Sequence, residues 1–298
     1  MPINIDGNNL DNISHSCILK LQAVYDSLKT AEKKAADLLI QNPELFSKGS
    51  IGEVSSKAGC SEATITRLSK KLGYDGYIDL KFQLTQSKES DSTEFYEDID
   101  ENDSYDTVVT KVFQASIQAL SDTLNTIDKE QYEIAVNLLC NADKIIFCGV
   151  GDSANVALSG YQKFLRMGLN VQASADFDIQ LINISLLKEN DVVIVISHSG
   201  RTKSIVDLAK YTRNIGAKVI CITNFPSSPL VKNSDVILLT AAFSEQLKGE
   251  VMAKRLTELC IIESLFVNLL LKKKTIFSRN IDKSNKALQK NKISSKIV

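Results

Sequence analysis

Apolar residues recur every three or four positions through the first eighty or so residues of the chain. Two runs show this helical spacing: Ile18, Leu21, Val24, Tyr25 and Leu28, then Ala31, Ala35, Leu38 and Leu39. The Asn42-Pro43 pair predicts the end of the second helix, since the residue before a proline disfavours helix. Strand-like alternation is absent from this part of the chain. The pattern therefore predicts an all-α N-terminal domain over residues 1–86.

The pattern changes after Asp143, where short β-branched runs begin to alternate with helical ones. Strands are predicted over 144–148, 170–172, 192–196, 218–222 and 236–240, and helices over 156–167, 179–187 and 203–214. A helical pair over 108–139 precedes them. Continuous apolar strands, each followed by an amphipathic helix, are typical of a parallel sheet covered on both faces. The expected fold is a doubly wound α/β domain over residues 108–271.

Charge is distributed unevenly along a chain whose formal net charge is only -1. Between Glu89 and Thr110 there are nine acids and no Lys or Arg, and from Lys272 to Val298 there are nine bases and one acid. The first segment predicts a linker over residues 87–107, and the second a basic tail over 272–298. The tail is either a solvated helix, a contact to the DNA backbone or a disordered segment.

Composition excludes several classes of protein. With 298 residues the chain is too long for a disulfide scaffold, and its six Cys and two His form no zinc-ligand pattern. No run of apolar residues is long enough to cross a bilayer, and the first residues lack a signal-peptide pattern. We expect a cytoplasmic protein with no membrane association, no metal and no cofactor.

The stretch from Ser50 to Leu72 has the spacing of two short helices joined by a glycine. Ser50 and Ser61 are the expected N-caps, and Gly59 is the expected turn. Apolar residues at Val54, Ala58, Ile65, Leu68 and Leu72 predict the buried faces, which matches a helix-turn-helix. The exposed face of the second helix then offers candidate contacts to double-stranded DNA: Ser61, Thr64, Thr66, Arg67 and Lys70.

The first predicted strand ends in a glycine-rich loop that opens a helix. Gly149 and Gly151 allow a tight turn close to an anion, and Ser153 adds a hydroxyl at the helix start. With Ala154 the loop also fits a dinucleotide-binding fingerprint, for which Asp176 or Asp178 is a candidate ribose ligand. A tight turn without any ligand is the remaining alternative.

The third predicted strand ends in a loop rich in hydroxyl groups, Ser197-His-Ser-Gly-Arg-Thr202. A helix cap needs one hydroxyl, and this loop has three together with Gly200, which favours a phosphate site built from Ser197, Ser199, Gly200 and Thr202. His198 is a weaker candidate. A third loop, after the next strand, adds Ser228 with equal weight for binding and for an ordinary turn.

These loops together resemble the sugar isomerase (SIS) domain, a doubly wound phosphosugar-binding module, over roughly residues 130–270. The resemblance implies that Ser153, Ser197, Ser199 and Thr202 hold the phosphate of a sugar, amino sugar or sugar acid. It also implies a homodimer or a higher homo-oligomer.

The helix-turn-helix, the acidic linker and the phosphosugar module, in this order, resemble the RpiR-type transcription regulators. The stretches that carry the resemblance are 35–43, 61–67 and 72–76. It implies a DNA-binding regulator of carbohydrate metabolism genes, more often a repressor, that responds to a phosphosugar and has no catalytic residues.

Two enzyme functions remain as alternatives. A phosphosugar isomerase with an accessory helical domain needs a general base, for which His198, Glu250 and Glu258 are candidates. Glu258 is also a weaker candidate contact to a regulatory sugar. A nicotinamide-dependent enzyme would bind its cofactor at Gly149 to Ala154 and would make no use of Ser197 to Thr202.

Overall fold

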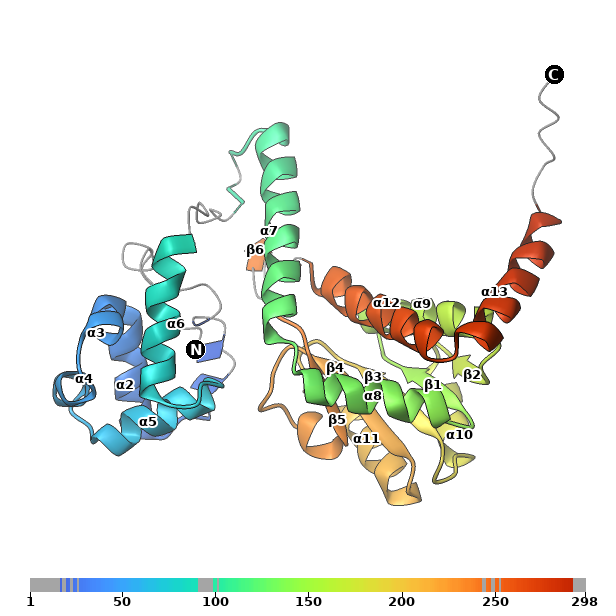
Figure 1. Ribbon diagram of the computed structural model, residues 1–298, viewed down its shortest axis with the longest axis horizontal. Coiled ribbons are helices and arrows are strands. Elements are labelled where there is room, and N and C mark those ends of the chain that lie inside the picture. Colours follow the sequence, from blue (N-terminus) through green and yellow to red (C-terminus); the bar gives the residue numbers. More distant parts are fainter. Residues whose placement is uncertain are drawn as a thin grey trace. The chain divides into compact units, whose positions relative to one another are not determined.

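The computed structural model describes residues 17, 20, 21, 24, 25, 27–90, 99, 100, 102–242, 245–247, 250, 251 and 253–291. Within these, the side chains at 83, 85–90, 245–247, 250 and 251 are not described. The chain divides into two compact units, Met1–Gln114 and Ala115–Val298, which are drawn with their elements in Figure 1. Each unit is considered by itself below.

The first unit is helical, as its periodicity predicts. Its helices are α2 (Thr30–Gln41), α3 (Pro43–Lys48), α4 (Ile51–Ala58), α5 (Glu62–Lys71) and α6 (Tyr77–Ser90). They pack around one core that includes Leu39, Phe46, Ile65 and Leu80, all fully buried. Asn42 ends α2 and caps α3 by accepting a hydrogen bond from the Leu45 N–H. The described residues thus confirm the all-α prediction for this unit.

Helices α4 and α5 form the predicted helix-turn-helix. Ser50 and Glu53 form a reciprocal capping box at the start of α4. Gly59 ends α4 in the left-handed conformation, with φ +62°, and Ser61 caps α5 by accepting from the Thr64 N–H. Leu68 and the other apolar residues expected on the inner faces are buried.

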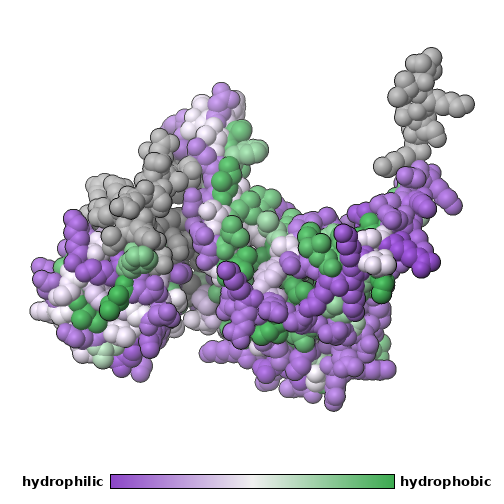
Figure 2. Space-filling view, in the orientation of Figure 1, coloured by the Kyte–Doolittle hydropathy of each residue, from purple (hydrophilic) through white to green (hydrophobic). Residues whose placement is uncertain are grey.

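Helix α7 (Tyr105–Thr126) contains the boundary between the two units. Five large apolar side chains stay exposed along it, four or seven residues apart: Tyr105, Val109, Phe113, Ile117 and Leu124. Figure 2 shows apolar residues along this helix. These five residues are called the α7 stripe below. Because an exposed apolar row on a helix marks a contact surface, this stripe bears on assembly.

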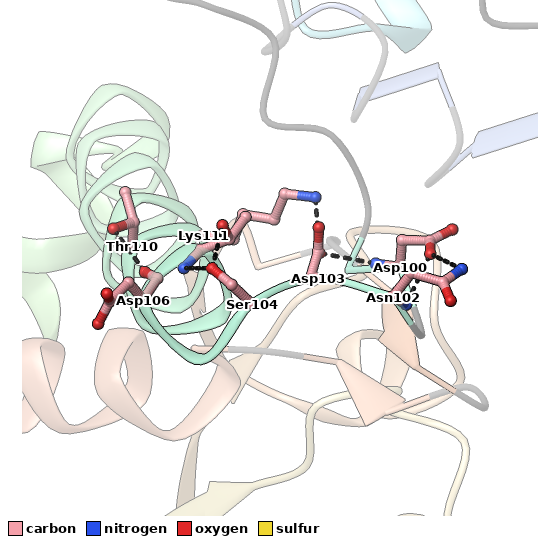
Figure 3. Close-up of polar contacts among 8 residues, drawn as sticks. Asp100, Asn102, Asp103, Ser104, Asp106, Thr110 and Lys111 are labelled. Carbon is pink, nitrogen blue, oxygen red and sulfur yellow. Dashed lines mark hydrogen bonds and ion pairs between the residues drawn. The ribbon is translucent and has the colours of Figure 1, made fainter.

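The start of α7 is held by a local polar network (Figure 3). Ser104 accepts from the Thr107 N–H, and the Asp103 carboxylate accepts from the Asp100 N–H and from Lys111 Nζ, both at 2.8 Å. The Lys111 ammonium is the main cause that lowers the pKa of Asp103. The predicted linker 87–107 therefore has helical residues at both ends, through Ser90 and from Tyr105, and residues 91–98 and 101 lie outside the described part.

The second unit is a parallel α/β sandwich. Its sheet has the strand order β2-β1-β3-β4-β5, with every pair parallel. The strands are β1 (Ile145–Cys148), β2 (Val171–Ala173), β3 (Val192–Ile196), β4 (Lys218–Thr223) and β5 (Val236–Leu239), and the helices are α8 (Lys129–Asn141), α9 (Asp152–Arg166), α10 (Phe177–Ser185), α11 (Lys203–Ile215), α12 (Lys254–Lys272) and α13 (Lys274–Gln289). A short hairpin, β6 (Glu245–Leu247) with β7 (Glu250–Val251), stands apart from the sheet. The order reverses between β1 and β3, and such a switch point is where α/β sheets bind ligands.

Helices cover both faces of this sheet (Figure 1). Alternate strand residues such as Phe147 and Ile194 pack with α8, α9, α12 and α13. Their neighbours Ile146 and Val193 pack with α10 and α11 on the other face. The strands are buried on both sides, which confirms the predicted doubly wound fold and explains why their sequences read as continuous apolar runs.

Helix α13 occupies much of the segment that sequence separates as a basic tail. Its residue Phe277 is buried in the core of the second unit. The helix packs on α9 and α12. The predicted tail is therefore helical over residues 274–289, which excludes a disordered segment there. Residues 292–298 lie outside the described part, and the domain limits of the sequence analysis remain predictions.

Candidate functional site

Helix α5 presents four of the five predicted DNA contacts at the protein surface. Ser61, Arg67 and Lys70 are exposed, and Thr66 is half-buried with its hydroxyl donating to the Glu62 carbonyl at 3.1 Å. Lys71 instead forms a 2.7 Å ion pair with Glu32, which is buried. This pair ties α5 to α2 and gives Lys71 a structural role.

The expected placement of Thr64 on the exposed face is wrong. Thr64 is 3% exposed, because it lies four residues before the buried Leu68 and so faces the same side of α5. Its hydroxyl lies 2.9 Å from Ser61 Oγ and accepts from the Arg67 guanidinium at 3.1 Å. Thr64 therefore connects the helix cap to an exposed arginine.

The loop after β1 is shaped by close backbone contacts. Gly149 lies against the backbone of Ser153, where a β-carbon would overlap it. Gly151 has φ +59° and ψ -129°, a conformation that favours glycine, and directly precedes α9. Gln180 of α10 holds the loop from behind by donating to the Gly149 carbonyl at 2.8 Å. These contacts place Ser153 in the first turn of α9.

The loop after β3 is held by the end of β4. The carbonyl of His198 accepts from the Thr223 hydroxyl at 3.1 Å and from the Asn224 N–H at 3.0 Å. Gly200 has φ +58° and packs on Ser228, whose hydroxyl a β-carbon at position 200 would overlap. Ser228 is buried behind the loop, so the structure does not bring it to the same surface as Ser197 and Ser199.

The two loops line one cleft of about 260 Å³ at the β1/β3 switch point. Its walls include six predicted residues: Ser153, Ser197, His198, Ser199, Thr202 and the weaker candidate Glu258. Asp152 at the start of α9 and Lys254 at the start of α12 also line it, and the sequence analysis missed both. Lys254 had no local signal in the sequence, since α12 begins about fifty residues after the loop.

Asp152 and Lys254 line the cleft as one negative and one positive charge, and Arg255 adds a second positive charge at Asp152. Lys254 Nζ lies 3.2 Å from the Asp152 carboxylate, and Arg255 adds a second contact to it at 3.8 Å. Burial raises the pKa of Glu258 to about 8, with Asp152 acting in the same direction and Lys254 opposing it. Burial and Lys254 lower the pKa of His198 to about 4. At neutral pH both groups are therefore mostly uncharged. Glu258 then does not repel an anion, and Lys254 carries the positive charge that attracts it.

Two polar groups at the cleft lack hydrogen-bond partners among the described residues. Glu258 Oε1 and His198 Nδ1 are buried without a hydrogen bond to any described residue. Helices α9 and α11, which begin at the cleft, have no side chain bonded to their first-turn amides in the described structure, whereas α8 and α10 are capped by Asp128 and Asp176. Because uncapped helix starts carry free N–H groups and the positive dipole end, this edge of the sheet suits an anion.

The candidate ribose ligand has another role. Asp176 accepts from the Ile179 N–H at 3.0 Å as the cap of α10. Asp178 is exposed on the same helix and does not line the cleft. The side chain of Glu250, one candidate base, lies outside the described part. Among the described residues no cluster of His, Cys, Asp and Glu is arranged to hold a metal ion.

Comparison with known proteins matches both units. A family model for the SIS domain matches residues 138–267, and one for the rpiR-family helix-turn-helix domain matches residues 15–91. An HTH-type transcriptional regulator of Thermotoga maritima is 35% identical over 85% of this chain and 91% of its own. The regulator HexR of Pseudomonas aeruginosa is 31% identical over 90% and 94%.

The chain belongs to the RpiR family of transcriptional regulators. Its RpiR-type architecture also appears in the structure of Vibrio vulnificus NanR complexed with ManNAc-6P, which covers 93% of this chain and 100% of that one with a TM-score of 0.60 at 21% identity. At that identity the likeness concerns the fold. The relatives that match this chain over almost their full length are named transcriptional regulators. Together with the helix-turn-helix domain, this supports a regulator over both enzyme alternatives.

No helix in the described ranges combines the length and the apolar character that crossing a membrane requires.

Proposed function

We propose that this RpiR-family regulator binds a phosphorylated sugar, amino sugar or sugar acid in the cleft at the β1/β3 switch point, and that binding changes its affinity for operator DNA. One observation carries the proposal. The two helices that start at the cleft have no side-chain cap, and serine and threonine hydroxyls surround them. The NanR structure, whose fold is similar, was solved with a sugar phosphate.

In this proposal the phosphate lies between the starts of α9 and α11. Ser153, Ser199 and Thr202 donate hydroxyl hydrogen bonds to it, and Gly149, Gly151 and Gly200 let the backbone approach. Ser197 is buried at 4% exposure with its N–H bonded to the Ile222 carbonyl, so it shapes the loop and offers its hydroxyl at the cleft wall. Lys254 supplies the positive charge.

The sugar portion then meets His198 and Glu258. A neutral carboxyl group both donates and accepts a hydrogen bond, and a neutral imidazole does the same. The unpartnered Glu258 Oε1 and His198 Nδ1 are therefore suited to sugar hydroxyls. Ser228 contributes from behind the loop by packing on Gly200.

DNA recognition is assigned to the exposed side of α5. Arg67 and Lys70 reach base edges or phosphates in the major groove, and Ser61 and Thr66 contact the backbone near the helix start. Thr64 keeps Arg67 in place through the 3.1 Å hydrogen bond.

The proposal includes a homodimer that acts in the cytoplasm, as a repressor of carbohydrate metabolism genes. Helix-turn-helix proteins read two half-sites as dimers, and the α7 stripe offers an apolar surface of the kind that a second copy buries. Mass measured by light scattering is expected to correspond to two chains, and to one chain when Phe113 and Ile117 are both changed to Asp.

A ligand screen tests the cleft directly. The thermal midpoint is measured with N-acetylmannosamine 6-phosphate, glucosamine 6-phosphate and 6-phosphogluconate, each beside its unphosphorylated form. Because a ligand that binds only the folded state raises its stability, at least one phosphorylated compound is expected to raise the midpoint while its sugar does not. Equal effects of sugar and sugar phosphate would contradict the phosphate site.

A further inference from the structure

Helix α13 carries a row of four bases on one side. The row is formed by Arg279, Lys283, Lys286 and Lys290, at intervals of four, three and four residues, and all four are exposed. At 3.6 residues per turn these positions fall within an arc of about 60°. They are called the basic stripe below. In the space-filling view the outer part of this helix is strongly hydrophilic (Figure 2).

The opposite side of α13 is fixed to the protein. Phe277 is buried in the core, and Ile281 packs against it. Asn280 Nδ2 donates to the Met167 carbonyl at 2.8 Å, and Asn285 Oδ1 accepts from the Arg166 guanidinium at 2.7 Å. Since this side is anchored at several points, the direction in which the basic stripe faces is set by the fold.

Folding makes use of other bases in this region. Lys272 donates to Asn137 Oδ1, and Lys273 donates to the Cys140 carbonyl near the end of α8. None of the four stripe side chains has a hydrogen bond or an ion pair to any residue in the described part of the chain. Four aligned charges repel one another, so they cost stability unless they serve a partner.

We propose that the basic stripe binds the phosphate backbone of the duplex DNA that this regulator binds. The inference rests on the DNA binding of this regulator family. The twelve residues from Arg279 to Lys290, the C-cap of α13, span about 16 Å. This length matches about five phosphates along one strand at about 3.4 Å per base pair. Residues 29–88 contain ten bases against seven acids, so four further charges add substantially to the attraction for DNA.

Another anionic partner fits the stripe less well. A helix that lies on a bilayer inserts a continuous apolar face, and the apolar side of α13 is already packed at Phe277 and Ile281. The acidic segment from Glu89 to Asp106 of the same chain is the remaining competitor. If this segment bound the stripe, it would compete with DNA, and removing the stripe charges would strengthen DNA binding.

The test compares two variants of the full chain with the same change in net charge. One is R279Q/K283Q/K286Q/K290Q, and the matched control is K129Q/K188Q/K210Q/K232Q, which neutralises four exposed lysines scattered over the same unit. Affinity is measured by fluorescence anisotropy for a duplex selected from a random library by the unmodified protein, over a range of salt concentrations. Intact folding is checked by thermal midpoint.

The stripe variant is expected to lose at least tenfold in affinity at low salt. The slope of log affinity against log salt should fall by about 0.9 for each phosphate contact removed, and the control should keep the slope of the unmodified chain. The half-stripe variants R279Q/K283Q and K286Q/K290Q should each give a partial loss.

Equal slopes for the stripe variant and its control would overturn the proposal, and so would tighter DNA binding by the stripe variant, which would indicate that the stripe holds the acidic segment. The thermal shift with sugar phosphates reports separately on the cleft. A failure of the stripe therefore leaves the proposed function untouched, and a failure of the cleft leaves the stripe untouched.

Discussion

The cleft of the second unit and helix α5 of the first unit present polar groups in opposite ways. At the cleft, Glu258 Oε1 and His198 Nδ1 are buried and lack partners among the described residues. On α5 the polar groups form a connected series, Ser61 to Thr64 to Arg67, and the outer members are exposed. Buried groups without partners are costly, and exposed satisfied groups are not.

This difference indicates what each surface recognises. The cleft is completed by a small ligand whose oxygens replace the missing partners, so its affinity depends on geometry. The exposed side of α5 binds a large polyanion mainly through charge, so its affinity depends on salt. Changes at the cleft should therefore act steeply and specifically, and changes on α5 should act through electrostatics.

The largest effect is expected for Gly200→Ala. The new β-carbon would overlap Ser228 Oγ at a backbone position with φ +58°, so both strain and overlap oppose the native loop. We expect a loss of stability of about 2 kcal/mol or more and no thermal response to sugar phosphates.

Gly76→Ala is the matched control, because no atom lies near its β-carbon position and its φ is not positive. A Gly200→Ala protein with normal stability and a normal ligand response would show that the loop conformation is not required.

The next effect is expected for Arg67→Gln on DNA binding. Loss of a contact to a base or phosphate costs about 1–3 kcal/mol, which corresponds to about fivefold to about 150-fold in affinity. Anisotropy with the selected duplex measures it, and Lys210→Gln on the other unit is the charge-matched control. Thermal shifts by sugar phosphates should be unchanged in both.

Ser199→Ala should weaken sugar phosphate binding by about tenfold, since one hydrogen bond to a charged group is worth about 1.5–3 kcal/mol. Isothermal titration with the compound found in the screen gives the affinity. Ser185→Ala, an exposed serine whose hydroxyl bonds the Ile182 carbonyl, should bind normally. Equal losses in both variants would point to a general change in the unit.

A smaller effect, a few-fold loss of operator affinity, is expected for Thr64→Val. Valine keeps the shape of threonine and removes the acceptor for Arg67, which frees the guanidinium without removing it. The double variant with Arg67→Gln should bind no more weakly than Arg67→Gln alone. Additive losses would show that Thr64 acts independently of Arg67.

The pH dependence of ligand binding separates the two surfaces further. Because the pKa of Glu258 is raised to about 8, its carboxyl group is neutral below that pH and becomes a carboxylate above it. The negative charge then repels the phosphate, so sugar phosphate affinity should fall as the pH rises through 8, and Glu258→Gln should remove this fall.

The same shift affects folding stability with a defined sign. A carboxyl group whose pKa is higher in the folded than in the unfolded state favours folding at low pH, and this stability is lost between about 4.5 and about 8. Denaturant unfolding at several pH values should show a flatter profile for Glu258→Gln. An unchanged profile would contradict the buried, raised carboxyl group.

Much of the fold follows from local patterns in the sequence. The core positions of α5, Ile65 and Leu68, follow from helical spacing, and β3 appears as the uninterrupted run Val192–Ile196. The start of α9 does not, because its first turn, Asp152 to Asn155, contains polar residues and alanine, and the apolar period begins only at Val156. Periodicity therefore places this helix start four residues late.

Apart from Glu258, the predicted residues of the cleft lie in two short loops, where they are neighbours in sequence. The loops after β1 and β3 are recognisable in the sequence by their glycines and hydroxyl residues. Lys254, from α12, and Gln180, which supports Gly149 from α10, are not. Such partners depend on tertiary packing. Thr64 was misplaced for a different reason: it lies four residues before the buried Leu68, so helical spacing itself puts it on the inner side of α5.

The most direct test of the account measures operator binding with and without ligand in one experiment. Anisotropy of the selected duplex is titrated with the unmodified protein and with Ser199→Ala, each at several concentrations of the sugar phosphate found in the screen. The account predicts that the ligand shifts operator affinity of the unmodified protein, and that Ser199→Ala needs about tenfold more ligand for the same shift. Operator affinity that does not respond to any sugar phosphate that binds the protein would contradict it.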